Sequence, residues 1–130
     1  MKKSEKIRNG KQWTEARFRS FIISALRAAS RRWGQKYAAL DVAFTERKTN
    51  KKTGLLAKHF KCAICSNEFI ATDVQVDHIH PVVDPKKGFN TWDEYIDRMF
   101  CEVDGYQVLC KPCHKTKTDQ EKSERKKNVS

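Results

Sequence analysis

Two pairs of cysteines constrain what this chain can fold into more than any other feature. Cys62 and Cys65 stand in the run CAIC, and Cys110 and Cys113 stand in CKPC, with 44 residues between the two C-x-x-C motifs. Four thiolates that meet at tetrahedral geometry suit zinc better than hard cations such as Mg²⁺. We therefore predict a structural Zn²⁺ held by these four cysteines, which clamps segments that a small core holds poorly.

Size and composition limit the architecture. The chain has 130 residues, 38% of them hydrophobic, which leaves room for one modest domain with a helical extension and a small core. No apolar signal-peptide segment follows the basic N-terminus, and no run of about 18 apolar residues is present to cross a membrane. We expect a reducing cytoplasm, where paired C-x-x-C motifs bind metal rather than form disulfides.

Charge is distributed unevenly along the chain. Residues 1–60 carry 16 Lys and Arg against 4 Asp and Glu, whereas residues 61–114 carry 5 against 9. An acidic centre between basic ends is expected of a protein that binds a polyanion and also holds divalent cations. We predict that the partner is DNA and not a membrane; the alternative is that the basic ends are solvated tails.

The N-terminal part predicts a basic, helical extension. Residues 1–12 show no apolar period and are expected to form an arm, while apolar residues three and four apart predict one amphipathic helix of about six turns over 14–37, with Gly34 as a point where it bends or ends. Three arginines lie off its apolar stripe and are candidates for phosphate contact, namely Arg17, Arg27 and Arg31. The alternative is an ordinary solvated face.

The polar run ERKTNKKTG, at 46–54, is expected to be a loop bounded by Gly54. Its cations are further candidates for contact with nucleic acid: Arg47, Lys48, Lys51 and Lys52. Residues 1–56 are thus predicted to form a DNA-binding extension and residues 57–130 the main domain.

The second half of the sequence predicts a mixed α+β domain. HFKCAICSNEFI predicts a strand folded over a cysteine knuckle, and DVQVDHIHPV predicts a strand ended by Pro81. The capping box TWDE predicts a short helix after Thr91, and Pro112 suits the first turn of a last helix to about Lys126, which follows a short strand YQVLC. The short helix is expected to bury Trp92, Tyr95, Ile96 and Met99.

A second metal site is predicted between the cysteine motifs. If the last helix begins beside the strand VQVDH, His114 in its first turn approaches Asp77. A carboxylate and an imidazole then bind a divalent ion and leave positions for water and phosphate oxygens, as Mg²⁺ prefers.

The arrangement CAIC … VDHIHPV … YQVLCKPCHKTK resembles the HNH endonucleases, specifically the ββα-metal (His-Me finger) type with a four-cysteine zinc site that is common in bacteriophages and mobile elements. The resemblance covers about Cys62 to Lys117 and is strongest in the runs D-H-I-x-P and L-C-x-x-C-H-x-x-K. It implies a small ββα-metal core with His78 as general base, Asp77 and His114 as ligands of a catalytic Mg²⁺ or Mn²⁺, and Lys117 at a phosphate. A phage-encoded member would act in the cytoplasm of the bacterial host.

One departure from the family pattern concerns an asparagine that normally precedes the second knuckle and braces the loop of the general base. Here the run is DGYQVLC, which places Gly105 there, and Asn90 and Asp104 are the candidates to replace it. Of the other polar residues, His80 is expected in a supporting or core role, His59 at the surface, and Cys101 as a buried thiol without a metal.

The expected reaction is hydrolysis of a phosphodiester bond in DNA, by nicking or by cutting both strands. An unperturbed histidine titrates near 6.5, so a neutral His78 accepts a proton from water near neutral pH. Two other functions stay open: a zinc-stapled DNA-binding module without catalysis, and an accessory subunit that acts with phage DNA-packaging or replication proteins. The sequence leaves monomer and homodimer equally open.

Overall fold

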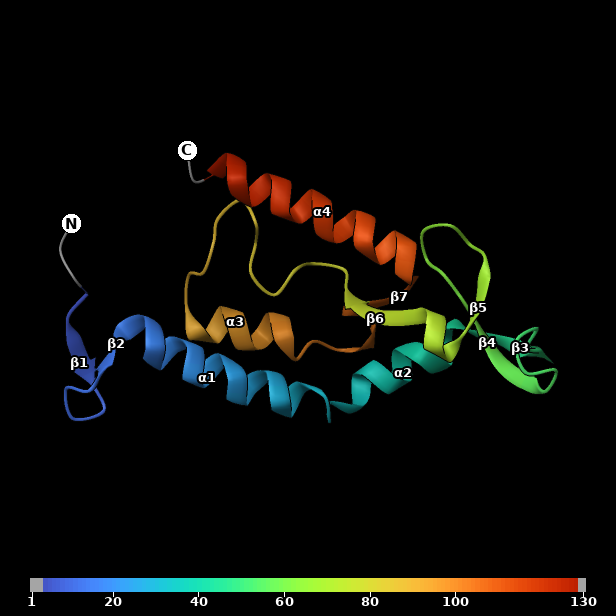
Figure 1. Cartoon of the computed structure of the whole chain (residues 1–130), viewed down its shortest axis with the longest axis horizontal. Helices are drawn as coiled ribbons and strands as arrows, with labels where there is room; N and C mark the ends of the chain where they lie inside the picture. The colour runs from blue at the N-terminus through green and yellow to red at the C-terminus, as the bar shows by residue number, and fades with distance from the viewer. Residues whose placement is uncertain (1–3, 129–130) are drawn as a thin grey trace. The chain divides into compact units, whose positions relative to one another are not determined.

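The structure, a computed structural model, describes residues 4–128 as a small mixed α+β protein (Figure 1). This confirms the predicted class. The chain divides after Trp33 into two compact units, each of which is described separately. The first holds β1 (Lys6–Arg8), β2 (Trp13–Thr14) and α1 (Glu15–Ser30). The second holds α2 (Gly34–Ala43), β3 (Phe44–Thr49), β4 (Leu56–Lys61), β5 (Glu68–Ile70), η1 (Ala71–Asp73), β6 (Val74–His78), α3 (Trp92–Met99), η2 (Val103–Gly105), β7 (Tyr106–Cys110) and α4 (Lys111–Asn128). The functional boundary predicted at 56/57 stays a prediction.

The N-terminal unit is more ordered than an arm. Residues 1–3 lie outside the described residues, but β1 and β2 pair as an antiparallel hairpin. Arg8 forms an ion pair with Glu15 at 2.8 Å, and its guanidinium lies 4.3 Å from the ring centre of Phe18. The Thr14 hydroxyl caps α1 by accepting the amide of Arg17 at 3.2 Å. The expectation of an arm without regular structure is therefore wrong for this hairpin.

The single helix predicted over 14–37 is wrong in its continuity. The Ser30 hydroxyl donates to the carbonyl of Arg27 at 2.7 Å, a side-chain bond that competes with the helical ladder. The amides of Arg32 and Trp33 then bond to carbonyls three residues back, at 3.0 and 3.1 Å, which tightens and ends the turn. A second helix, α2, starts directly afterwards at the glycine that the sequence marks as a bend.

Two small antiparallel sheets build the second unit. The first has the order β3-β4-β5, and the second pairs β6 with β7 in the register Asp77↔Gln107. The expected loop at 46–54 is wrong in its first half, because Phe44–Thr49 is paired with β4 as a strand. The cysteine knuckle between β4 and β5, the strand VQVDH and the strand YQVLC are confirmed.

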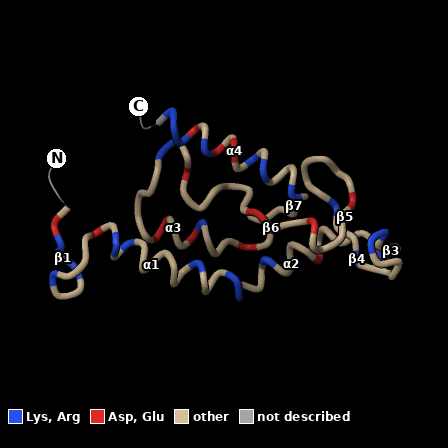
Figure 2. Tube along the Cα trace, viewed as in Figure 1, with Lys and Arg blue, Asp and Glu red and all other residues tan. Residues whose placement is uncertain are grey.

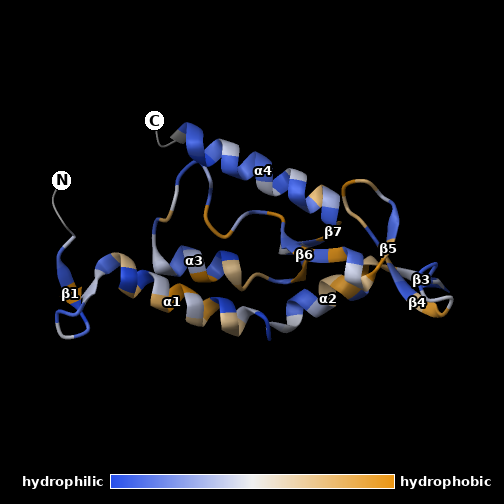
Figure 3. Cartoon of the chain, in the orientation of Figure 1, coloured by the Kyte–Doolittle hydropathy of each residue, from blue (hydrophilic) through white to orange (hydrophobic). Residues whose placement is uncertain are grey.

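The core lies between the two sheets and α2. Phe60, Val74 and Val108 form one buried cluster, and Leu109 forms another with Cys62 and Cys110. Figure 3 shows apolar colour on α2, whereas α4 is largely hydrophilic. Because few apolar side chains are buried, a metal bound at the second cluster would add stability that this small core lacks.

Both predicted helix starts in this unit are confirmed. Thr91 caps α3 by accepting the amide of Glu94 at 3.1 Å, and α4 carries Pro112 in its first turn. The predicted buried side of α3 holds for Tyr95 and Met99, but Ile96 is 40% exposed. Among the described residues, no helix combines the length and the apolar character that a bilayer crossing requires.

Candidate active site and metal centre

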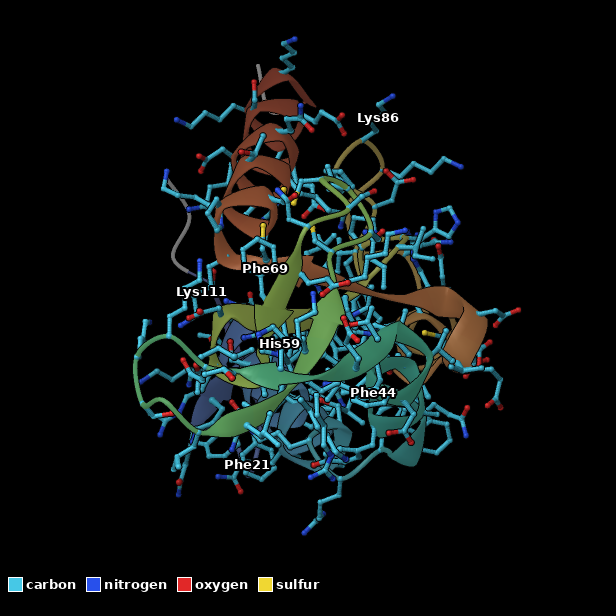
Figure 4. The ribbon with its side chains drawn as sticks, turned by 90° about the vertical axis from the view of Figure 1, so that its right-hand side faces the viewer. Phe21, Phe44, His59, Phe69, Lys86 and Lys111 are labelled. Atoms are coloured by element: carbon cyan, nitrogen blue, oxygen red, sulfur yellow. The ribbon has the colours of Figure 1, made fainter. Side chains whose placement is uncertain are left out.

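The four cysteines of the two C-x-x-C motifs come together in the second unit. Their sulfur atoms all lie within 4.8 Å of one another, and Cys62 and Cys110 are buried. The Ala63 amide donates to the Val108 carbonyl at 2.8 Å and so ties the first knuckle to β7. Phe69, on β5, packs over this cluster (Figure 4). Four thiols at this spacing could hold a structural metal ion such as zinc, and Cys101 is not among them.

The acidities of these thiols fit a cation-binding role. Burial alone would raise the pKa of the Cys62 thiol, but backbone amides, that of Cys110 first, donate to its sulfur and lower the pKa to about 6. The neighbouring thiol of Cys110 and burial raise the pKa of Cys113 to about 12. The Cys62 thiol thus ionises easily, whereas the pKa values of Cys110 and Cys113 are raised, so a full set of thiolates needs a cation among them.

A second group of polar side chains meets where β6 lies beside the start of α4. Because α4 follows β7 without an intervening loop, His114 is held in the first helical turn next to Asp77 of β6. The atoms His114 Nε2 and Asp77 Oδ1 are 3.8 Å apart, and both side chains are partly buried. The structure therefore brings together the two residues that the sequence proposes as ligands of a second ion.

Lys117, one turn further along α4, is placed against carboxylates. Its ammonium lies 2.8 Å from Asp77 Oδ2 and 2.7 Å from Glu121 Oε1, and it donates to the carbonyl of His78 at 3.0 Å. Burial alone would lower the pKa of Lys117, but the two carboxylates outweigh it and raise the pKa. Sequence reasoning missed Glu121, although its position four residues after Lys117 on a helix is a signal for such a pair.

The Asp77 carboxylate faces two groups through its two oxygens. Its Oδ2 is buried and lies 2.8 Å from the Lys117 ammonium, a cation that offsets the cost of burying this charge. Its Oδ1 faces His114 Nε2 at 3.8 Å. Asp77 and His114 could thus supply one oxygen and one nitrogen ligand to an ion, whose other positions would fall to water and phosphate oxygens.

His78 is oriented by the main chain. Its Nε2 donates to the Met99 carbonyl at 2.9 Å, and its ring lies against that of Tyr106 with centroids 4.8 Å apart. A carbonyl only accepts hydrogen bonds, so Nε2 carries the proton and Nδ1 of the neutral ring is left as the acceptor. The Tyr106 hydroxyl donates to the same carbonyl at 3.0 Å, which fixes that acceptor from a second side.

The space at Gly105, where the family carries asparagine, is filled by Cys101. A Cβ placed on Gly105 would lie 2.7 Å from Cys101 Sγ and 3.0 Å from Cys101 Cβ, closer than real contacts allow. The Gly105 carbonyl instead accepts the amide of Ile79 at 2.9 Å, directly beyond His78. The candidate replacement Asn90 is exposed, and its side-chain amide donates to Glu94 on α3. Asp104, the other candidate, is exposed.

The remaining candidate residues are mostly exposed. His80 is exposed, and the His59 ring bonds to its neighbour's carbonyl, that of Ala57, at 2.9 Å. Figure 2 shows Lys and Arg recurring along α1 and on β3. In the first unit the Arg17 guanidinium lies 4.7 Å from the ring centre of Trp13. The other predicted cations are exposed except Lys48, namely Arg27, Arg31, Arg47, Lys51 and Lys52.

Comparisons with protein-family models, with characterised proteins and with solved structures found no match for this chain. The resemblance to HNH endonucleases therefore depends on the motifs alone. Any function has to be argued from the geometry of the site.

Proposed function

We propose that this protein is a metal-dependent DNA endonuclease of the HNH type, in which β6, β7 and α4 form the ββα-metal core. The observation that carries the proposal is the meeting of Asp77 and His114 within 3.8 Å, beside a His78 ring whose protonated nitrogen is fixed by the main chain. These are the three residues to which the motif resemblance assigns the chemistry.

Asp77 and His114 would hold one Mg²⁺ or Mn²⁺, while the four cysteines hold a structural Zn²⁺. The bound ion would neutralise charge on the phosphate and on the departing 3′ oxygen. The 3.8 Å between Asp77 Oδ1 and His114 Nε2 supports this assignment, because a carboxylate oxygen and an imidazole nitrogen at this separation can bind one ion together.

His78 acts as general base. With Nε2 bonded to the Met99 carbonyl, Nδ1 accepts a proton from the water that attacks phosphorus in line with the 3′ oxygen. The same hydrogen bond stabilises the imidazolium that forms, because Nε2 donates more strongly from a charged ring. The products carry 5′-phosphate and 3′-hydroxyl ends.

Lys117 supports the site through its charge. In the structure it balances Asp77 and Glu121 together. When an ion binds beside Asp77, the ammonium would remain paired with Glu121 and would add positive charge for the phosphate.

A plasmid assay tests the proposal. Zinc-loaded protein is incubated with supercoiled plasmid, with and without added Mg²⁺ or Mn²⁺, and His78→Ala is compared with the matched control His80→Ala. We expect wild type and the control to nick or cut only with the added ion, and His78→Ala to be slower by about 10²- to 10⁴-fold. Both variants should keep zinc and DNA binding, because neither residue belongs to the cysteine cluster.

Equal cleavage by His78→Ala would remove His78 as the base. Wild type that binds DNA and never cuts it would favour the non-catalytic DNA-binding module, for which the basic residues of α1 and β3 are sufficient. Cleavage that appears only with an added phage packaging or replication protein would favour the accessory subunit.

A further inference from the structure

The β3–β4 hairpin extends beyond the core. At its base Phe44 pairs with Phe60, their ring centroids are 6.2 Å apart, and Phe60 is buried. Further out, residues on both strands are exposed, as Figure 4 shows from the side on which Phe44 and His59 are labelled. The outer half of this hairpin therefore contributes little to the core.

The strand register separates the outer side chains into two faces. Arg47 is opposite Lys58 and Thr49 is opposite Leu56, so these four side chains project from one face, which we name the ribbon face. Lys48, opposite Ala57, projects from the other face. There Lys48 forms ion pairs with Glu46, at 3.3 Å, and with Glu68 of β5.

The two cations of the ribbon face have no acidic partner. No acidic side chain among residues 4–128 forms an ion pair with Arg47 or Lys58, although the two are directly opposite each other. The Lys58 ammonium lies 5.8 Å from the ring centre of Phe44. Like charges opposite each other on neighbouring strands destabilise a hairpin. An anion bound across the two strands would offset this cost.

The tip of the hairpin is held in shape by its own hydrogen bonds. The Asn50 carbonyl accepts the amides of Thr53 and Gly54, its amide donates to Leu55, and its side chain accepts the amide of Lys52 at 3.0 Å. Gly54 has a φ of +73°, which a residue with a side chain rarely adopts. Because the tip is already ordered, docking it costs little conformational entropy.

Two leucines at the end of this ordered tip, Leu55 and Leu56, are each 70% exposed. Leu56 lies on the ribbon face by its register, and burial of this side chain against a partner would be favourable. The ribbon face thus combines two cations with an apolar side chain and a threonine.

We propose that the ribbon face of the β3–β4 hairpin enters the major groove of duplex DNA. A two-stranded ribbon fits that groove, whose width is about 12 Å. Arg47 and Lys58 lie on opposite strands and reach the phosphates on the two walls, while Leu56 and Thr49 face the base edges, where they contact thymine methyl groups. This inference rests on the duplex DNA substrate proposed above. It adds that the ribbon face is the surface that contacts the bases.

Equilibrium binding of the zinc-loaded full chain to a labelled duplex, selected by the wild type from a random pool, tests this proposal. The titrations are made without Mg²⁺ or Mn²⁺, so that binding is measured apart from cleavage. Arg47→Gln and Lys58→Gln should each weaken binding roughly five- to tenfold near 0.1 M salt and reduce the salt slope by about one. The matched control Lys61→Gln, an exposed lysine of β4 on the opposite face, should change binding less than twofold.

Base contact is tested with the same duplex carrying uracil in place of thymine. Wild type should lose about fourfold in affinity, the equivalent of one buried methyl group. Leu56→Ser should lose affinity for the thymine duplex and show no further loss with uracil. Circular dichroism and zinc content, equal to those of wild type, show that each variant is folded.

Unchanged binding by Arg47→Gln and Lys58→Gln, or an equal loss with Lys61→Gln, would overturn the ribbon face while leaving the nuclease proposal intact. Tighter binding to single-stranded RNA than to duplex DNA would also overturn it. Hairpin-dependent binding by a wild type that never cuts would support the ribbon face and contradict the nuclease.

Discussion

The cysteine cluster and the group formed by Asp77, His78 and His114 lie on either side of the same β7–α4 junction, and they are built in opposite ways. The cysteine cluster is complete by itself: four sulfurs lie within 4.8 Å of one another, two of them on buried residues. The second group offers only two ligand side chains, 3.8 Å apart. Its remaining order comes from neighbours, namely the Met99 carbonyl and the Lys117 ammonium.

This is the difference expected between a metal site that stabilises a fold and a metal site that catalyses a reaction. A structural metal site fills every coordination position with protein ligands, whereas a catalytic one keeps positions open for water and substrate. The first should fail completely when one ligand is lost. Substitutions of the residues around the second site should each change stability or ion affinity by a smaller amount.

Loss of one cysteine should have the largest effect. Cys110→Ser removes a buried ligand, so we expect loss of zinc and unfolding at 25 °C, because zinc binding contributes on the order of 10 kcal/mol to such folds. Zinc content and circular dichroism measure the result. The control Cys101→Ser, outside the cluster, should keep zinc; a folded, zinc-loaded Cys110→Ser protein would contradict the assignment.

A substitution at Gly105 should be the next largest in effect. Gly105→Ala forces its Cβ against Cys101, so we expect a loss of about 1–3 kcal/mol in the free energy of unfolding, measured with urea. Adding Cys101→Gly removes the clash and should restore part of the loss. Additive effects in the double variant would show that the two residues do not share this space.

Removal of the Lys117 charge should make the second site bind a divalent ion more tightly. In Lys117→Met, Asp77 and Glu121 lose their shared cation, so Mn²⁺ should bind the zinc-loaded protein about tenfold more tightly. Mn²⁺ titration followed by electron paramagnetic resonance measures this. Lys115→Met, whose charge pairs with Asp119 instead, is the control. Weaker Mn²⁺ binding by Lys117→Met would argue against an ion beside Asp77.

The smallest effect is expected at Tyr106. Tyr106→Phe removes one of two donors to the Met99 carbonyl and should cost about 1 kcal/mol of stability. Burial, with a contribution from Cys101, raises the pKa of the Tyr106 phenol. The unfolded chain therefore releases this proton at a lower pH than the folded protein, and wild type should lose stability as the pH rises above about 10.

Urea titrations of wild type and Tyr106→Phe between pH 8 and 11 measure this difference. The variant lacks the phenol, so its stability should fall less over that range. Parallel curves for the two proteins would show that Tyr106 is not held in its protonated form.

The parts that the sequence predicted are those specified by residues close together in the chain. Each C-x-x-C motif, the cap at Thr91 and the helix start at Pro112 follow from local geometry, and the structure contains all of them. The strand at 44–49 was missed because its polar residues resemble a loop, and it is stabilised as a strand by pairing with β4. The single helix over 14–37 failed because the bond from Ser30 to a carbonyl cannot be seen in an apolar period.

The sequence predicted which residues meet at the candidate site, but not the contacts that hold them in place. The motifs brought out Asp77, His78 and His114, but Lys117 was expected at a phosphate and lies between two carboxylates. The partner that orients His78 is a backbone carbonyl, which has no sequence signature. What fills the place of the family asparagine likewise depends on a tertiary contact, that of Cys101 with Gly105.

Cys113 and His114 are neighbours in the first turn of α4, and successive side chains on a helix point about 100° apart. One turn thereby aims a sulfur at the other three cysteines and an imidazole at Asp77. Inserting a single residue between them would rotate the rest of the helix by that angle about its axis. The cysteine and the histidine would then no longer face their two sites together. The distance between the motifs can vary with loop length, but this adjacency has no such tolerance.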